Sequence, residues 1–298
     1  MMQNGGFVLG GVSAKELGII MISSSRRPIL PSTVDRTMAI PGRHGAWDFG
    51  ADLGPRLFDI ECAFVTTSPT KLQKAVSDLA AFLVDEYGRP RTMELTFSVQ
   101  PERSYFVRYS GSLPIDRVIG LGRFTLPLIA YDPFAYAEAT AFDVDPGEYD
   151  TGLDYDSGAI YPNTQSLQWQ YTYHMSSLYN YGPLVTPLRL DIEGAFSNLT
   201  ATNLNTGQSF TLSMTNPADH VVVVDARMMQ VYQAVIGEET TFINAEFPAL
   251  FEDYMNRVNK LSSFSGDFIF LQPGENKFVF QGESPDATIR FRWKHKFA

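Results

Sequence analysis

The 298-residue sequence contains a single cysteine and only four histidines, and this scarcity removes several classes of site. Cys62 alone cannot form an intramolecular disulfide or a multi-cysteine metal site. The histidines, at positions 44, 174, 220 and 295, have no second histidine or carboxylate at metal-site spacing. Neither a Gly-x-Ser-x-Gly elbow nor a phosphate-cradling Gly-Lys-Ser/Thr loop is present. The sequence therefore predicts no enzyme, no cofactor and no metal.

Basic residues are also scarce, and long apolar runs are missing. The chain has 23 Lys and Arg against 33 Asp and Glu, whereas phosphate binding needs clustered basic side chains. Small basic clusters occur at Arg26–Arg27 and Arg290–Lys296. No apolar run approaches the roughly 18 residues that span a bilayer, and Met1–Gly11 does not have the pattern of a signal peptide. We therefore expect no nucleic-acid recognition, no membrane, and synthesis in a cytoplasm.

The composition is that of a globular protein, and the length suits two domains. Hydrophobic residues make up 44% and charged residues 19% of the chain, which is not the composition of a disordered protein. The composition shifts at Asp143–Asn180, and Pro146–Asn163 is expected to be a linker or a surface insertion. We predict an N-terminal domain over 1–138, a linker or insertion with a leading strand over 139–180, and a C-terminal domain over 181–298.

The N-terminal domain is expected to combine several strands with one helix. Residues 57–65 alternate between apolar and polar, which is typical of a half-buried strand. Ser68 suits a helix N-cap and Pro69 the first helical position, and Gly88 with Pro90 should end that helix. Further strands are expected at 7–9, 18–22, 93–99, 105–110 and 124–130, with a strand–turn–strand arm at 113–122. This order predicts an α+β barrel or a sheet closed by the helix.

The stretch Ile40–Gly50 combines turn residues with aromatic residues. Its proline and three glycines favour a tight turn at Pro41–Gly42. The alternate spacing of Trp47 and Phe49 favours a short strand with both rings on one face. Two interpretations are open: a hairpin loop capped by an aromatic plug, or a turn that packs against another chain.

From residue 180 onward, short strands separated by turns predict a β-sandwich or jelly roll. Strands are expected at 184–193, 199–203, 209–214, 220–225, 229–236, 267–271, 277–281 and 288–294, with turns at 205–207, 216–217, 272–276 and 284–286. Residues 167–173 should form one strand with Trp169, Tyr171 and Tyr173 on one face. Residues 242–259 are expected to be a short helix or an irregular insertion.

Several of these motifs resemble the siphophage distal tail protein (Dit) family. The pattern Ile40-Pro41-Gly42-Arg43-x-Gly45, followed by an aromatic residue, Asp and Gly, is similar to the family's N-terminal signature. His44 stands where the family more usually has Asp, so a salt bridge at that position is in doubt. Leu128–Tyr136 resembles the end of the family's ring domain. The motifs that resemble its galectin-like C-terminal domain include Asn180-Tyr181-Gly182, Asn205-Thr206-Gly207 and Leu271–Asn276.

The resemblance implies a non-enzymatic structural protein of the virion, at the distal end of the phage tail, made in the host bacterial cytoplasm. The N-terminal domains would form a homo-hexameric ring between the tail tube (major tail) protein and the tail-tip hub protein. The C-terminal domains would offer a platform for receptor-binding proteins during host adsorption.

A head-to-tail ring needs two different complementary faces on each subunit. We place these faces in Pro28–Gly50 and in the arm Leu113–Gly122, and ordinary surface loops are the other interpretation. The expected interface residues are Pro41, Gly42, Arg43, His44, Gly45, Trp47, Asp48, Ile115, Asp116 and Arg117.

A carbohydrate-binding module is the alternative function, because sugars bind exposed aromatic platforms with polar neighbours. The candidate contacts to host cell-wall glycans are Trp169, Tyr171 and Trp293, although such residues can equally pack in a core. Asp150, Asp154 and Asp156 offer oxygen ligands of the kind calcium prefers, but they lack EF-hand spacing and are expected to form a solvated acidic loop. A glycan hydrolase would need an acid/base pair, and none is recognisable.

Overall fold

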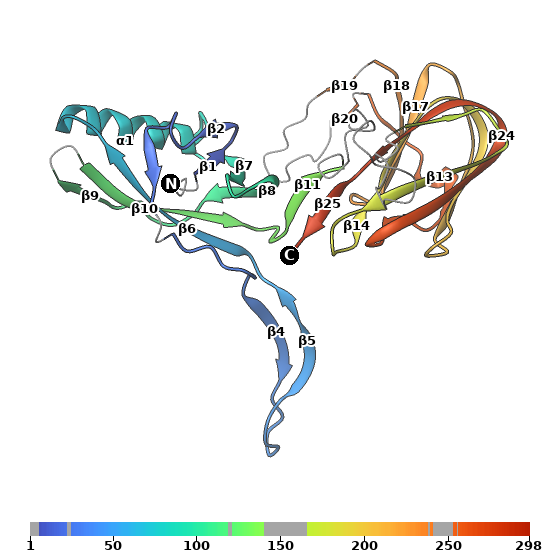
Figure 1. The fold of residues 1–298 in the computed structure, drawn as a ribbon. Coiled ribbons are helices and arrows are strands. Elements are labelled where there is room, and N and C mark those ends of the chain that lie inside the picture. Colours follow the sequence, from blue (N-terminus) through green and yellow to red (C-terminus); the bar gives the residue numbers. More distant parts are fainter. Residues whose placement is uncertain are drawn as a thin grey trace, which may run out of the picture. The chain divides into compact units, whose positions relative to one another are not determined.

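The computed structural model describes residues 6–22, 25–118, 121–139, 166–237, 239–240, 253–254 and 256–298. The chain divides into two compact units, unit 1 mainly up to Ala135 and unit 2 mainly from Tyr136 onward. Both are built of strands, with a single α-helix among the described residues, which confirms the mainly-β prediction (Figure 1). The candidate calcium ligands Asp150, Asp154 and Asp156, and most of the expected linker, lie outside the described residues.

Unit 1 is a curled antiparallel sheet with the strand order β2-β1-β7-β8-β10-β6-β3, and β9 pairs with β10 (Figure 1). The strands are β1 (Phe7–Leu9), β2 (Val12–Ser13), β3 (Ile19–Met21), β6 (Arg56–Val65), β7 (Thr92–Phe97), β8 (Gln100–Tyr109), β9 (Ile115–Val118) and β10 (Leu121–Ala130). β6 and β10 pair along their whole lengths. Phe58, Ile60 and Phe64 of β6 are buried, as the alternating pattern predicted.

The helix α1 (Pro69–Leu83) covers one face of this sheet (Figure 1). The backbone N–H of Lys71 donates to the Ser68 side chain, and Pro69 opens the helix, so the predicted N-terminus is confirmed. Leu72, Leu79 and Leu83 pack into the core of the sheet. The expected end at Gly88 is wrong, because Val84 leaves the helix in extended conformation and pairs with Pro90.

A separate antiparallel hairpin, β4 (Thr33–Met38) and β5 (Trp47–Leu53), projects away from the sheet of unit 1 (Figure 1). The turn between the strands contains the predicted Pro41–Gly42 step, and Gly42 and Gly45 adopt φ of 82° and 83°. Trp47 and Phe49 are exposed. They do not plug a core, so of the two interpretations the aromatic plug is wrong.

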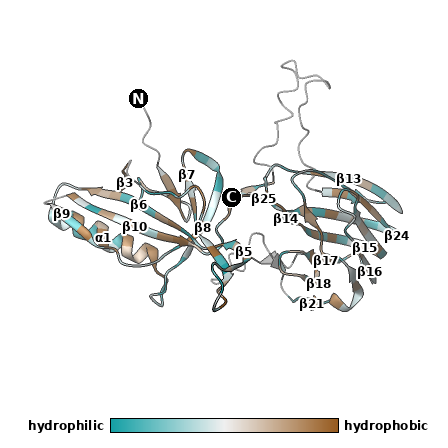
Figure 2. Cartoon of the chain, turned by 90° about the horizontal axis from the view of Figure 1, so that it is seen from below, coloured by the Kyte–Doolittle hydropathy of each residue, from teal (hydrophilic) through white to brown (hydrophobic). Residues whose placement is uncertain are grey.

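Unit 2 is a two-layer sandwich whose strands run β12-β24-β15-β17-β18-β21, with β13 beside β24 and β16 beside β15 and β22. The strands are β12 (Ser166–Trp169), β13 (Tyr173–Asn180), β15 (Arg189–Asn203), β16 (Ser209–Asn216), β17 (His220–Asp225), β18 (Gln230–Val235), β21 (Val258–Asn259), β22 (Phe264–Gly266) and β24 (Gly274–Arg292). Brown and teal alternate along the strands of both units in Figure 2, as expected for half-buried sheets.

The long strands β15 and β24 take part in both layers of the sandwich. The segment Arg189–Glu193 of β15 lies between β17 and the segment Thr288–Arg292 of β24. The segments Thr200–Asn203 and Phe278–Gln281, which pair with each other, lie between β16 and β13. The strands bend at register shifts between these parts, near Gly194. The aromatic core of unit 2, which includes Trp169, Phe196, Phe278, Phe280, Phe291 and Trp293, fills the space between the layers.

These bends correct the predicted strands of unit 2. β15 joins the expected strand 199–203 to the part of 184–193 from Arg189 onward, and β24 joins 277–281 to the part of 288–294 up to Arg292. The expected turn at 284–286 is an irregularity inside β24. The predicted strand 167–173 is interrupted, since the chain turns between β12 and β13. Residues 242–252 of the expected insertion lie outside the described residues, and the chain beyond them adds β20 (Asp253–Tyr254) and β21.

The strand β25 (Lys294–Phe297) is held in place by the Asn180-Tyr181-Gly182 motif. The Tyr181 N–H donates to Nδ1 of the buried His295 at 3.2 Å, and Asn180 Oδ1 lies 3.2 Å from the same nitrogen. Nε2 of the ring lies 3.1 Å from the Ala139 carbonyl oxygen. Asn180 Oδ1 accepts from the Gly182 N–H at 3.0 Å, and its amide donates to the Leu184 carbonyl at 2.9 Å. The motif therefore has a structural role in unit 2.

Candidate functional site

The β4–β5 hairpin carries its largest exposed apolar side chains on one face, together with the Arg36–Asp52 ion pair. The register pairs Met38 with Trp47, and strand alternation puts Val34 and Phe49 on the same side. These four side chains are between 48% and 62% exposed. The opposite side carries Thr33, Asp35, Thr37 and Asp48, and beyond the register shift it also carries Ala51 and Leu53. The structure therefore gathers the aromatic residues of the predicted turn motif on one open surface, which we call the apolar hairpin face.

Polar contacts give this hairpin its shape. The Arg43 guanidinium lies 4.4 Å from the centroid of the Trp47 ring, a cation–π contact that ties the turn to β5. Asp48 accepts a hydrogen bond from the Gly50 N–H at 2.8 Å, where Gly50 adopts a φ of 92° beside a register shift. Arg36 forms an ion pair with Asp52. Arg43 and Asp48, both predicted interface residues, thus shape the hairpin itself.

The apolar hairpin face is large enough to matter energetically. A fully covered aromatic side chain buries roughly 150–250 Å², so two half-exposed rings with Val34 and Met38 present on the order of 300–400 Å² of apolar surface. The largest apolar patch on a typical monomer has about this size and is often functional. A two-stranded hairpin is also only marginally stable by itself in water. The face therefore suits contact with another protein surface.

The second predicted surface, the arm, lies elsewhere on unit 1. β9 pairs with β10 next to α1, whereas the hairpin projects from the sheet (Figure 1). Asp116 is exposed, but Ile115 is half-buried and packs toward the core, so Ile115 is not an open contact residue. Arg117 pairs with Gly122 through the backbone, and its side chain is not among those that the structure describes. The structure does not bring the two predicted surfaces together.

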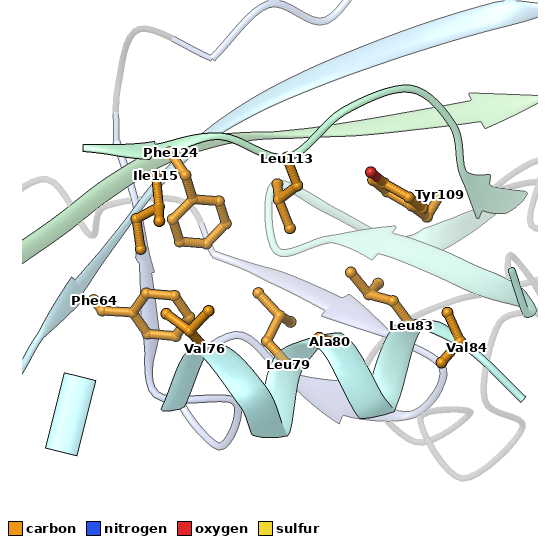
Figure 3. A pocket seen from close by; sticks show the side chains of 10 residues that line it. All are labelled: Phe64, Val76, Leu79, Ala80, Leu83, Val84, Tyr109, Leu113, Ile115 and Phe124. Atoms are coloured by element: carbon orange, nitrogen blue, oxygen red, sulfur yellow. The ribbon is translucent and has the colours of Figure 1, made fainter. Parts of the chain in front are cut away.

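A cavity of about 250 Å³ separates α1 from the arm, and the sequence did not predict it. Its lining residues are Phe64, Val76, Leu79, Ala80, Leu83, Val84, Tyr109, Leu113, Ile115 and Phe124 (Figure 3). The Tyr109 hydroxyl donates to the Gly111 carbonyl at 2.7 Å and is thereby satisfied. The lining otherwise has no polar side chain, so the cavity suits apolar groups only.

The candidate glycan contacts do not form a platform. Trp169 and Trp293 are 0% and 1% exposed, whereas Tyr171 is 67% exposed. The Trp169 ring packs 5.8 Å from that of Phe196 in the core of unit 2. The chain turns after Trp169, which separates it from Tyr171. This burial argues against the glycan-contact prediction for both tryptophans.

The described part of the chain offers few side chains arranged for metal binding or catalysis. Among these residues, no three His, Cys, Asp or Glu side chains gather as a metal site would require. No helix within the described ranges is long and apolar enough to cross a bilayer. Burial raises the pKa of the Cys62 thiol to about 12, so Cys62 carries a neutral thiol near pH 7.

Comparisons with known proteins connect unit 1 and the whole fold to phage tails. Residues 13–130 match the family described as the phage tail protein RIFT-related domain. The structure is similar to that of the Dit protein (gp 19.1) of SPP1, described as a paradigm of hub adsorption apparatus in Gram-positive infecting phages. That match has a TM-score of 0.62 at 14% identity and covers 99% of this chain and 100% of that chain.

Two chains from the activated baseplate of phage p2 are more distant. The one from the structure with Sr has a TM-score of 0.43 at 6% identity and covers 97% of both chains. The one from the structure with Ca has a TM-score of 0.38 at 7% identity and covers 95% of this chain and 99% of that chain. These two similarities add nothing to the fold assignment. No curated protein matches the sequence significantly.

Proposed function

We propose that this protein is a structural component of the phage tail tip. Residues 13–130 match the phage tail protein RIFT-related domain, and the chain has the fold of a siphophage distal tail protein. The observation that carries this proposal is the apolar hairpin face, which lies on the same unit as the phage tail domain. The role is architectural and involves no catalysis. Its place in the virion is the distal end of the tail.

The proposed assembly is a ring of six copies joined through unit 1. A closed ring uses head-to-tail contacts, in which each copy offers two different surfaces. The apolar hairpin face supplies about half of the roughly 800 Å² per partner that a stable interface buries, so a second surface of unit 1 must complete the contact. In this assembly the predicted residues Pro41 to Asp48 lie at the subunit boundary.

The proposed partners follow from the tail-tip position. One side of the ring would meet the tail tube protein and the other the tail-tip hub protein, and unit 2 would hold receptor-binding proteins during adsorption. These partners are proposed because the chain shares its fold with a protein described as a paradigm of hub adsorption apparatus. Glycan binding is not proposed, because the two tryptophans that motivated it are buried.

Solution mass tests the ring. Light scattering coupled to size exclusion, over a wide concentration range and with the neighbouring tail proteins present or absent, should give the mass of six chains. Immunogold electron microscopy of virions should place the label at the far end of the tail. A single-chain mass under every condition, or label anywhere else on the particle, would reject the proposal.

A further inference from the structure

Ile29 has the most exposed large hydrophobic side chain in the described part of the protein, at 90% exposure. It lies between Pro28 and Pro31, which restrict the backbone on both sides. Nη2 of Arg56 donates to the Ile29 carbonyl at 3.2 Å, and Nη1 of Arg56 donates to the Tyr105 hydroxyl at 2.9 Å. A buried arginine therefore fixes the backbone of a residue whose side chain points into solvent.

This arrangement differs from an ordinary surface hydrophobic residue, which needs no special explanation. The neighbouring Leu30 is also exposed, and the preceding Arg27 lies 4.7 Å over the Phe97 ring. The hydrogen bond from Arg56 and the contact of Arg27 with Phe97 both limit the motion of the segment around Ile29 before binding. Little conformational entropy of its backbone therefore remains to be lost on association. We call the side chains of Ile29 and Leu30 the aliphatic knob.

The cavity beside α1 has the chemistry and size to receive such a knob (Figure 3). An apolar cavity of about 150 Å³ is enough to bind benzene. The cavity of about 250 Å³ therefore has room for one branched aliphatic side chain and part of a second. Ala80 lines it from an exposed position on α1, which places the small alanine side chain at the mouth.

Charged side chains flank both features. Arg26 and Arg27 are exposed directly before the aliphatic knob. The cavity lies beside the C-terminal half of α1, where the helix dipole is negative and no basic residue occurs in the last turn. Asp85 and the exposed Glu86 follow the lining residue Val84. Arg89 and Arg91 of the same loop lie over the rings of Tyr87 and Phe82 and balance these two acidic side chains, so the apolar lining of the cavity, and not its charge, selects the occupant.

We propose that the aliphatic knob of one copy of this chain inserts into the α1 cavity of a second copy. The inference rests on the proposed self-assembly and identifies the second surface that the ring needs beside the apolar hairpin face. Knob and cavity are different surfaces of the same unit, so the contact is head-to-tail and can close into a ring.

Matched variants test each side of the contact by light scattering. Ile29→Asp places a carboxylate on the knob, with Val99→Asp, another exposed aliphatic position, as its control. Ala80→Trp fills the cavity mouth, and Ala81→Trp places the same ring at an exposed helix position outside the lining. Ile29→Asp and Ala80→Trp should each raise the dissociation constant of self-association roughly ten- to a hundredfold, and the controls should leave it unchanged.

Mixing the two variants gives a second, independent outcome. Ile29→Asp retains the cavity and Ala80→Trp retains the knob, so at a concentration where neither variant self-associates, an equimolar mixture should form dimers of one copy of each. If Ile29→Asp and Ala80→Trp both assemble like the wild type, the knob contact is wrong while the ring stands. If the wild type never associates, the proposed function and the knob contact both fail.

Discussion

The Cα atom of Gly182 lies so close to the backbone of Lys296 that a Cβ placed there would stand 2.5 Å from the Lys296 carbonyl oxygen. Gly182→Ala must therefore displace β25, and we expect it to lower the free energy of unfolding of unit 2 by about 3 kcal/mol. Urea titration followed by the emission of the buried Trp169 and Trp293 measures this loss. Gly207→Ala, where a Cβ meets no atom within 4 Å and only the φ of 75° opposes it, should cost roughly 1 kcal/mol. Equal losses would contradict the steric explanation.

The two sides of the hairpin should respond differently to substitution. Trp47→Ala combined with Phe49→Ala removes most of the apolar hairpin face, and we expect the assembled mass to fall toward that of one chain. Because both rings are exposed, the free energy of unfolding of the monomer should change by less than about 1 kcal/mol. Asp35→Ala combined with Thr37→Ala changes the polar side and should assemble like the wild type. Light scattering that finds both pairs equally assembled would rule out the apolar face as a contact.

A buried ionic network in unit 2 should be sensitive to the loss of one carboxylate. Asp191 is fully buried and accepts from Nε of Arg189 and from Nε of Arg292, both at 2.7 Å. Asp191→Asn leaves two cations without their anion, and breaking such a buried pair costs about 3–5 kcal/mol. Lys277→Gln removes an exposed pair with Glu275 and should cost at most about 1 kcal/mol. Chemical unfolding of the two variants should separate them clearly, and similar losses would refute this account.

Cys62 should make the protein more sensitive to alkali. Burial raises the pKa of its thiol from 9.0 to about 12, so between these pH values the unfolded chain ionises while the folded chain does not. The stabilisation is complete below pH 9 and is lost as the pH rises toward 12. Between pH 8 and pH 10 the free energy of unfolding should fall by about 1.4 kcal/mol more in the wild type than in Cys62→Ala. Parallel pH profiles for the two proteins would contradict this assignment.

The elements that the sequence predicted well are those with local signals. β6 follows from strict alternation and the start of α1 from a serine cap and a proline. The strands β15 and β24 were divided wrongly because the signal of a bulge resembles that of a turn. Ser284-Pro285-Asp286 stays within β24, where a register shift against β15 accommodates it, and nothing near these residues in the sequence indicates that partner strand.

The candidate site shows the same division between local and tertiary information. The fold implied by the Dit resemblance is confirmed, and the alternate spacing of Trp47 and Phe49 correctly put both rings on one face. Their exposure depends on the hairpin standing apart from the sheet, which no local pattern encodes. The α1 cavity was missed because its walls come from a helix, an arm and three sheet strands far apart in sequence. Trp169 and Tyr171 were grouped wrongly, since the turn after β12 breaks the alternation.

The central position of β24 has a consequence for synthesis of the protein. This strand lies between β15 on one side and β12 and β13 on the other, so unit 2 stays open until residues 274–292 have left the ribosome. The strands β1, β2, β3 and β6 to β10 of the sheet of unit 1 have all been synthesised once residue 130 has emerged. Domains emerge and fold in chain order. Nascent chains can therefore present the hairpin while half of the polypeptide is still unfolded, so the proposed ring would begin to assemble on polysomes.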